Sequence, residues 1–446
     1  MKYNIMFASH PDYSGNAKAL YEYVKKSRKD CNTVWVSYED DTYIQMKLRN
    51  INCVRYDTKD FYEAFDKTNI VIFTHDELIK LKKENQIYIY LDHGKGCKKI
   101  GYFLNKKNMA FGDFEYLNKM YDSVDYIICS SALCKLFYHV AYDISMDRVL
   151  DIGTPRTDFL YQKDCEKKIQ KLCDIDLKKF SKIILYLPTI RNGIGRNNDG
   201  NFNNNILNLE NYDDDLLNEY LKKHNYLLII KFHPFEKNVK KKENYSNIIY
   251  INEELSKKNL ISLPEYISTV DLIIGDYSSA HIDYLILDKP ICFLCNDIEE
   301  YSLNRGILID NFNFWFPGPL IKTFENLKVE IDNLIKNKDY YSKERKMFVD
   351  LMFYKTKKDN CKRFCQYFFD KKRDILEESR KLKSKEYRKI CENKIQELQL
   401  KNEKIEELKY LNEELKQRLF QLENSKGWKI IEKIRKIKNK ILYVIK

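Results

Sequence analysis

The sequence has no run of about 18 apolar residues, the length that a membrane-spanning helix requires. We therefore expect no transmembrane helix. The N-terminus, Met1–Ile5, lacks the charged head, the long apolar run and the small-residue cleavage site of a signal peptide. This segment is typical instead of the first strand of a core sheet.

Paired cysteines are also missing. The 12 cysteines are scattered and form no short disulfide framework, which favours a reducing cytosol with free buried thiols. Cys292 and Cys295 have CxxC spacing, but they lie in a predicted strand, where residues three apart point to opposite faces. No second cysteine or histidine pair follows at ligand spacing, so a structural zinc site is not expected.

Glycine and proline are few, 13 and 8 in 446 residues, and both almost vanish after Asp370. Charged residues dominate that C-terminal segment, and its apolar residues repeat every seven positions. One series is Leu398, Ile405, Asn412 and Leu419, and a second, offset by three residues, is Leu408, Leu415 and Leu422. This a/d heptad pattern predicts a coiled coil over residues 376–424 and hence a homo-oligomer. The polar Asn412 would favour one register and a low oligomer number.

Acidic residues are scarce at the C-terminal end. The chain has a net charge of +12, and residues 425–446 contain eight basic residues and one acid, so they supply +7 of it. An apolar stripe there consists of Ile430, Ile431, Ile434, Ile437, Ile441 and Ile445, and it is flanked by Lys429, Lys433, Lys436 and Lys440. With Trp428, this pattern predicts a basic amphipathic helix that contacts an anionic membrane surface, and not a nucleic-acid-binding protein. The alternative is a terminal helix packed on a partner subunit.

Short apolar runs alternate with longer amphipathic segments before residue 370. The candidate strands are Asn4–Phe7, Val34–Ser37, Ile70–Thr74, Ile87–Leu91, Tyr126–Cys129 and Val149–Ile152, then Ile183–Leu187, Leu227–Lys231, Ile248–Ile251, Leu272–Ile274 and Ile291–Leu294. Such runs are typical of parallel strands buried on both faces, and the alternation predicts doubly wound α/β halves. The charged stretch Lys163–Ser181 separates two domains, residues 1–165 and 175–370. A nucleotide would bind between them.

The first half carries two clusters with chemical potential. His93, Gly94, Lys95 and Lys98 follow the strand Ile87–Leu91. The histidine could accept a proton from an attacking hydroxyl, because imidazole titrates near neutral pH. Arg156, in a Gly-Thr-Pro turn, could hold a phosphate bidentately. The alternatives are a glycine turn with solvated lysines and a loop salt bridge.

The second half carries two more clusters. Lys231 and His233 follow the strand Leu227–Ile230, where both could donate to phosphate oxygens. The strand Leu272–Ile274 leads through Asp276 into a predicted helix headed by Ser278 and Ser279. The free N–H groups at such a helix start form an anion site. The alternatives are a structural histidine and ordinary N-capping by Asp276 or Ser278.

The ordered motifs HGKGCKKIG, TPRTDFL, LYLPTIR, IIKFHP and GDYSSAHIDYLILDKPICFL resemble the CDP-glycerol glycerophosphotransferase family of teichoic-acid polymerases and primases. The stretches Tyr301–Gly306 and Phe316–Pro319 are similar to the family's closing segment. The resemblance covers Ile87–Ile335 and, more weakly, Ser9–Tyr23. Five motifs in the same order are far more specific than any one of them.

The resemblance implies a GT-B fold in which the second domain binds a CDP-polyol donor, such as CDP-glycerol. A hydroxyl of a lipid-linked or polymer acceptor would attack the donor's β-phosphorus, and CMP would leave, in teichoic-acid-like or capsular polymer synthesis. His93 matches the family's proposed base, and His233 matches the histidine near the pyrophosphate. The residues expected at the donor phosphates and nucleotide are Arg156, Arg191, Lys231, Asp276, Ser278, Ser279, Asp283 and Arg305. Gly94, Lys95 and Lys98 would lie on the acceptor side.

Two features leave alternatives open. The family usually has Thr-Pro-Leu after His-Gly, whereas Lys95-Gly96-Cys97 follow here, so the acceptor and the polyol stay open. No acidic pair compels a metal, and we expect no obligate cofactor, although a pyrophosphate could bring Mg²⁺. A GT-B glycosyltransferase that uses a nucleotide sugar, or a coiled-coil scaffold, would share many of these features. The preferred prediction is a peripheral transferase at the cytoplasmic face of the cell membrane.

Overall fold

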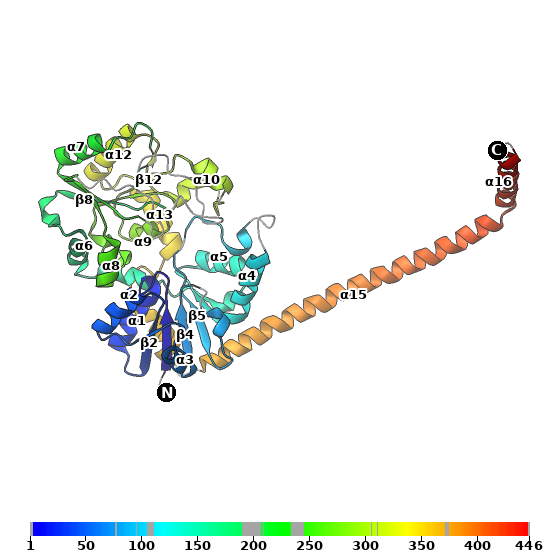
Figure 1. Ribbon diagram of the computed structural model, residues 1–446, viewed down its shortest axis with the longest axis horizontal. Coiled ribbons are helices and arrows are strands. Elements are labelled where there is room, and N and C mark those ends of the chain that lie inside the picture. The colour runs from blue at the N-terminus through cyan, green and yellow to red at the C-terminus, as the bar shows by residue number, and fades with distance from the viewer. Residues whose placement is uncertain are drawn as a thin grey trace. The chain divides into compact units, whose positions relative to one another are not determined.

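The computed structural model describes residues 3–75, 78–94, 96–104, 111–189, 207, 209–232, 245–304, 306–309, 311–370 and 374–444 (Figure 1). The chain divides into two units, Met1–Ser379 and Arg380–Lys446. The first unit is an α/β structure with two parallel sheets, which confirms the predicted fold class at this level. We call the region around each sheet the first lobe and the second lobe.

The first lobe is built on a seven-stranded parallel sheet with the order β3-β2-β1-β4-β5-β6-β7. Its strands are β1 (Tyr3–Ala8), β2 (Cys31–Ser37), β3 (Cys53–Arg55), β4 (Ile70–Phe73), β5 (Ile87–Tyr90), β6 (Tyr126–Ile128) and β7 (Val149–Leu150). The main helices between them are α1 (Gly15–Ser27), α2 (Asp40–Leu48), α3 (Lys59–Asp66), α4 (Phe111–Ser123) and α5 (Ala132–Tyr142). Every residue of β4 and β5 is buried, as expected for strands that helices cover on both faces.

The second lobe repeats this plan with a six-stranded parallel sheet, ordered β10-β9-β8-β11-β12-β13. Its strands are β8 (Lys182–Tyr186), β9 (Tyr226–Ile230), β10 (Ile248–Tyr250), β11 (Leu272–Gly275), β12 (Ile291–Leu294) and β13 (Leu320–Ile321). The helices are α7 (Asp214–His224), α8 (Glu253–Asn259), α9 (Ala280–Leu285), α10 (Ile298–Asn304), α11 (Phe312–Trp315) and α12 (Phe324–Lys336).

Both sheets reverse their strand order at one point, between β1 and β4 in the first lobe and between β8 and β11 in the second. At such a switch point the loops after the two strands diverge and leave room for a ligand. The residues that follow β1, β4 and β5 therefore share one edge of the first sheet. Those that follow β8 and β11 share one edge of the second.

Several helices connect the lobes. The chain passes from the first sheet through the 3₁₀ segment η5 (Pro155–Tyr161) and α6 (Cys165–Cys173). After the second sheet, α13 (Ser342–Phe353) and α14 (Asn360–Cys365) follow, and α14 packs on α1 and η5 of the first lobe. The ring of Phe369 then lies 5.0 Å from that of Tyr3. Part of the segment assigned to residues 175–370 thus lies against the first lobe.

Details of the sequence prediction differ from the structure. The two short strands β3 and β13 are absent from the strands expected from the sequence. The helical pattern at Leu263–Thr269 forms two 3₁₀ turns. The helix after the tandem serines is α9, which has six residues and begins at Ala280, after both serines. Cys292 lies in β12 and Cys295 lies one residue after the strand, and the two belong to separate core clusters.

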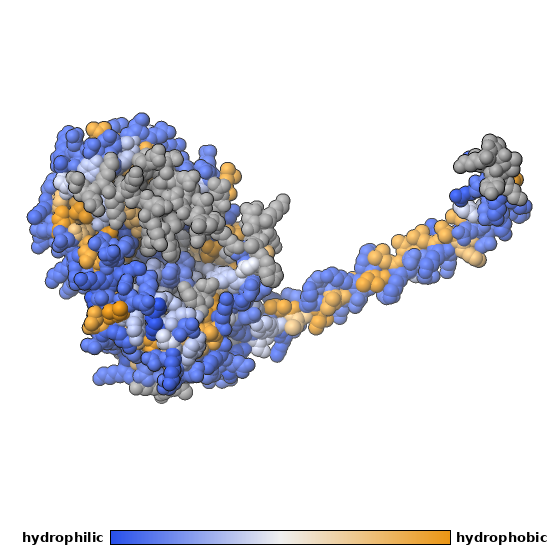
Figure 2. Space-filling view, in the orientation of Figure 1, coloured by the Kyte–Doolittle hydropathy of each residue, from blue (hydrophilic) through white to orange (hydrophobic). Residues whose placement is uncertain are grey.

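The C-terminal part consists of two helices, α15 (Ile375–Asn424) and α16 (Lys426–Val444). Ion pairs one turn apart, such as Lys401–Glu397 and Arg418–Glu414, each at 2.6 Å, support α15. Figure 2 shows hydrophobic residues running along α15 among hydrophilic ones, and the heptad leucines are exposed. Among the described residues, no helix is both long and apolar enough to span a bilayer.

Candidate active site

Five of the predicted site residues meet where the two lobes face each other. The guanidinium of Arg156 donates from Nε to a carboxylate oxygen of Asp283 at 2.5 Å, and from Nη1 to the backbone oxygen of His93. A Cβ built on Gly94 would lie 2.8 Å from Ser279 Oγ and 3.2 Å from Arg156 Nη1. The His93 loop of the first lobe therefore touches the serine segment of the second. Burial opposes the charge of Arg156, but Asp283 raises its pKa above the ordinary value.

His93 has an acidic neighbour that the sequence analysis did not single out. Its Nδ1 lies 3.4 Å from Oδ1 of Asp92, and 57% of its side chain is exposed. Asp92 is buried and accepts hydrogen bonds from the hydroxyls of Tyr138 and Tyr90. A carboxylate beside Nδ1 constrains that edge of the ring and can accept a hydrogen bond from Nδ1 when that nitrogen carries the hydrogen. The opposite nitrogen, Nε2, can then take a proton from a substrate hydroxyl.

Two further histidines accompany His93 at the same sheet edge. His75 follows β4, and its ring stacks on that of His93 with centroids 4.4 Å apart and an interplanar angle of 26°. His10 follows β1, and its ring meets that of His75 edge-on at 5.4 Å. Burial, together with the nearby His93 and His10, lowers the pKa of His75 from 6.5 to about 3, so this ring is neutral at physiological pH.

Asn16, near the start of α1, holds this edge together. Its amide donates to the backbone oxygens of Leu91 and Asp92 at 3.1 and 2.9 Å, and its side-chain oxygen accepts from the backbone N–H of Arg156 at 3.0 Å. Asp92 has a positive φ of 56°, an uncommon conformation for a residue other than glycine. The hydrogen bonds from Asn16 to Leu91 and Asp92 hold the backbone at that position, and the third joins it to Arg156.

In the second lobe, Asp276 bridges the switch point. One carboxylate oxygen accepts from the backbone N–H and the hydroxyl of Thr189, at 2.7 and 2.5 Å, and the other accepts from the N–H of Ser278 at 3.0 Å. Ser278 Oγ accepts from the N–H of Ala280 at 3.3 Å. The N-cap of α9 is Ser279, whose side chain makes no capping hydrogen bond, and the buried Asp276 orders the segment that carries Ser278 and Ser279.

The segment that departs from the family pattern pairs with the second lobe. Lys98 forms an antiparallel bridge with Ile307, and the N–H of Leu308 donates to the oxygen of Cys97 at 2.7 Å. The ammonium of Lys98 lies 5.8 Å from the ring centroid of Tyr301. Cys97 is buried, which agrees with a packing role. The expected acceptor-side residue Lys98 thus contacts both lobes.

Other predicted site residues are not joined to this group. Lys231 pairs with Glu253 at 2.6 Å, at the start of α8. Among the interactions of the described residues, Lys231 has none with Arg156, Ser278 or Ser279. Lys95, Arg191, His233 and Arg305 lie outside the described residues. Within the described parts of the chain, no group of three or more His, Cys, Asp or Glu side chains could hold a metal ion.

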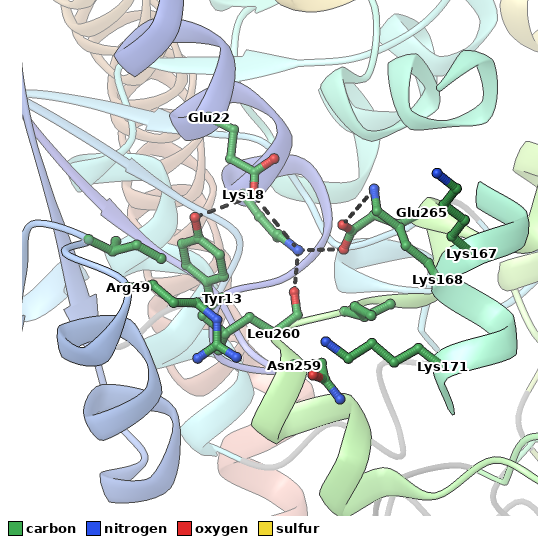
Figure 3. A pocket seen from close by; sticks show the side chains of 12 residues that line it. Tyr13, Lys18, Glu22, Arg49, Lys167, Lys168, Lys171, Asn259, Leu260 and Glu265 are labelled. Atoms are coloured by element: carbon green, nitrogen blue, oxygen red, sulfur yellow. Dashed lines mark hydrogen bonds and ion pairs between the residues drawn. The ribbon is translucent and has the colours of Figure 1, made fainter. Parts of the chain in front are cut away.

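A cavity of about 380 Å³ lies elsewhere between α1, α6 and the residues around η8 (Leu263–Glu265) (Figure 3). Its polar centre is the buried side chain of Lys18, which donates to Glu265 and to the backbone oxygen of Leu260. Lys168 Nζ lies 3.4 Å from Glu265. Burial opposes the charge of Glu265, but Lys18 and Lys168 lower its pKa. The network links the first lobe to the second.

The residues that the sequence analysis missed are His10, Asn16, His75, Asp92 and Thr189. Each of them follows or adjoins the carboxyl end of a predicted strand. A search for polar side chains at every strand end, beyond the motifs, would have found them. Their grouping depends on the strand order, which the sequence does not state.

A known family model matches most of the chain. Residues 2–370 match the family model described as CDP-Glycerol:Poly(glycerophosphate) glycerophosphotransferase. The chain belongs to this family. The transferase is 28% identical over 372 residues to a teichoic acid poly(glycerol phosphate) polymerase of Bacillus spizizenii, with 80% of this chain and 90% of that relative covered. It is 30% identical over 334 residues to a teichoic acid glycerol-phosphate primase of Bacillus subtilis, which covers 72% of this chain and 81% of the relative.

Ribitol-phosphate enzymes are also among the proteins similar to this chain. A teichoic acid ribitol-phosphate polymerase, TarK of Staphylococcus aureus, is 27% identical over 354 residues, or 77% of this chain and 64% of the relative. The solved wall teichoic acid polymerase TagF superposes with a TM-score of 0.66 at 22% identity, over 86% of this chain and 89% of that one. This structural likeness confirms the GT-B-like fold of the transferase. The recognition of the family from its five motifs is confirmed as well.

Proposed function

We propose that this glycerophosphotransferase moves a polyol phosphate, with glycerol phosphate as the first candidate, from a CDP-linked donor to a hydroxyl of a teichoic-acid-like acceptor. The observation that carries the proposal is the Asp92–His93 pair facing Ser279 and Arg156. One side supplies a base, and the other supplies donors and positive charge for phosphate oxygens. Membership of the family makes the reaction class a phosphotransfer.

In the proposed reaction, the acceptor hydroxyl attacks the β-phosphorus of the donor. The new P–O bond forms as the bond to the oxygen of the leaving CMP breaks, and the hydroxyl proton passes to Nε2 of His93. Asp92 stabilises the resulting imidazolium through Nδ1. No covalent intermediate is required. The protein contributes alignment and charge stabilisation, which are the main sources of catalysis in phosphoryl transfer.

The donor side is assigned by residue chemistry. Ser278 and Ser279 would donate to the phosphates, and Asp276 would order them through Thr189 and the Ser278 N–H. Arg156, held by Asp283, would complete the positive side. Lys231, Arg191 and Arg305 keep the donor-binding roles predicted from the motifs, and His233 acts as the second catalytic histidine, near the pyrophosphate. We propose that the protein alone holds no metal. Any Mg²⁺ would therefore arrive bound to the pyrophosphate of the donor.

The C-terminal helices are proposed to localise the enzyme. We propose that the heptads of α15 form a coiled coil with a second copy of the chain. The basic face and apolar stripe of α16 would contact the anionic cytoplasmic surface of the membrane, where a lipid-linked acceptor is found. Capsular polymers are a second possible product class for the same chemistry.

The decisive experiment supplies the full chain with CDP-glycerol, CDP-ribitol or UDP-glucose and an acceptor carrying glycerol phosphate. Release of CMP from a CDP-polyol, with growth of the acceptor by mass spectrometry, is expected. Release of a nucleoside diphosphate from the sugar nucleotide would instead support a glycosyltransferase. His93→Asn should lower kcat about 100-fold or more, as loss of a general base does. Matched reactions with EDTA and with Mg²⁺ test the metal.

A further inference from the structure

We propose that His75 is a positioning residue for His93: its neutral ring supports one face of the catalytic imidazole and keeps Nε2 aimed at the acceptor hydroxyl. This inference rests on the proposed function, in which His93 is the base. It goes beyond the motif residues, since His75 lies in none of the motifs that define the resemblance.

The ring of His75 lies against one face of the His93 ring. A stack with centroids 4.4 Å apart and a tilt of 26° brings the two rings into face-to-face contact. More than half of the His93 side chain is exposed, so packing around it does not fix its orientation. Asp92 constrains only the Nδ1 edge, at 3.4 Å. Without the His75 face, the ring could rotate about the Asp92 contact, and a displacement of about 1 Å can cost about 100-fold in rate.

His75 is itself held by contacts with Thr74 and His10. Its Nδ1 lies 3.0 Å from Oγ1 of the buried Thr74, and the same oxygen accepts from the backbone N–H of His10 at 3.4 Å. Because that oxygen already accepts a hydrogen bond, its own hydrogen is available to Nδ1 of His75. When that hydroxyl donates to Nδ1, the neutral ring carries its hydrogen on Nε2. The edge-on ring of His10, at 5.4 Å, supports His75 from the other side.

The neutral charge state of His75 suits a His93 ring that becomes a cation. When His93 takes the acceptor proton, it becomes a cation between the carboxylate of Asp92 and the face of His75. A neutral aromatic face attracts a cation stacked on it, whereas a protonated His75 would repel it. The burial that lowers the pKa of His75 therefore keeps the support compatible with the charged state of His93.

The strand order explains why these residues meet. β4 lies between β1 and β5 in the sheet, so the residue after β4 lies between those after its two neighbours. His10, His75 and His93 are the residues at those three strand ends. The imidazole row is thus built by the topology, which brings together three residues from distant parts of the sequence.

The test compares His75→Ala, His75→Leu and His75→Phe in the full chain, with CMP release from CDP-glycerol as the assay. We expect His75→Ala and His75→Leu to lower kcat about 10- to 100-fold while KM for the donor changes little, because alignment and not donor binding is lost. His75→Phe restores a flat neutral face and should recover kcat to within about threefold of wild type. His224→Ala, a histidine of the second lobe away from this row, is the matched control.

A second readout does not depend on turnover. The chain has seven histidines, so selective ¹³C labelling of histidine gives few ring signals. His75→Ala should move the His93 ring signals by removing the ring current of its neighbour, and His75→Phe should preserve a ring-current shift. If His75→Ala does not fold, His75→Leu is judged by the same two criteria.

The inference is overturned if His75→Leu or His75→Ala turns over like wild type, if His75→Phe is as slow as His75→Leu, or if only KM changes. Unmoved His93 signals in a folded His75→Ala would also overturn it. Wild-type enzyme that releases no CMP from any CDP-polyol would instead contradict the proposed function. The histidine spectra would still decide whether His75 orders His93.

Discussion

At the scale of single residues, the site depends on a glycine that allows two lobes to touch. Gly94 has a φ of +154°, and a Cβ there would lie 2.8 Å from Ser279 Oγ and 3.2 Å from Arg156. The shorter contact is with the end of the Ser279 side chain, so a methyl group at Gly94 would have to displace that hydroxyl or move the His93 loop. Glycine, which also adopts this φ readily, lets the loop approach the serine segment without either change.

We predict that Gly94→Ala lowers kcat/KM about tenfold or more, since small displacements of reacting groups are costly. CMP release at low donor concentration measures the effect. Gly112→Ala is the control, because a Cβ at Gly112 meets nothing within 4 Å. Wild-type activity for Gly94→Ala would show that the loop and the serines do not act together.

At the scale of secondary-structure elements, α1 connects the active-site edge to the second lobe. Asn16 bonds to the segment before His93, and Lys18, half a turn later, reaches Glu265 in η8. Lys18 and Glu265 are both almost fully buried. Removing one partner of such a pair leaves an uncompensated charge, which is far more costly than removing both.

We predict that Lys18→Met lowers the free energy of unfolding by about 3 kcal/mol. The midpoint of urea unfolding measures this loss. Lys26→Met, on the exposed face of the same helix, should leave the midpoint unchanged. Adding Glu265→Gln to Lys18→Met should recover part of the loss, because the remaining charge is removed. Equal midpoints for Lys18→Met and Lys26→Met would mean that the pair does not stabilise the two-lobe unit.

The heptads of α15 lead to a separate prediction. Exposed leucines at a and d positions favour association with a second helix. We expect the wild-type chain to sediment as an oligomer, and Leu408→Lys with Leu415→Lys to sediment near the monomer mass of 53.7 kDa. Leu400→Lys, outside both heptad series, is the control. Identical masses for wild type and the double variant would contradict the coiled coil.

At the scale of the whole molecule, localisation and catalysis involve different parts of the chain. The residues of the site belong to the unit Met1–Ser379, whereas α16 belongs to Arg380–Lys446. Deleting residues 425–446 should therefore reduce binding to vesicles that contain anionic lipid, because each basic residue near such a surface contributes about 1 kcal/mol. CMP release with a water-soluble acceptor should be unaffected. Equal sedimentation of both forms with the vesicles would contradict the membrane contact.

The stability of the whole molecule should also fall in mild acid. His281 is buried against the ring of Phe293, at 4.9 Å, and burial lowers its pKa from 6.5 to about 4. Between these values the unfolded chain binds a proton that the folded chain does not, so the free energy of unfolding decreases as pH falls. The stability is fully present above pH 6.5 and is lost towards pH 4.

The loss from this histidine should approach about 3 kcal/mol. Urea unfolding at several pH values measures the slope. His281→Phe keeps an aromatic ring and should flatten the dependence, whereas His224→Phe, at a partly exposed site, should flatten it less. An unchanged slope in His281→Phe would mean that His281 is not buried in its neutral form.

The family, the two-lobed α/β class and most of the strands follow from local sequence patterns. Buried parallel strands are continuous apolar runs, and motifs such as HG and YSS are local, so both can be identified without coordinates. The heptad and basic patterns of the C-terminal helices are equally local, although their partners remain predictions.

Only the tertiary structure decided which residues share the site. The Arg156–Asp283 pair, the closeness of Gly94 to Ser279 and the row His10–His75–His93 all join segments distant in sequence. These contacts depend on strand order and on how the lobes meet, which local patterns do not encode. The sequence placed His93 correctly at a strand end, but the fold supplied Asp92 in its left-handed conformation and His75 beside it.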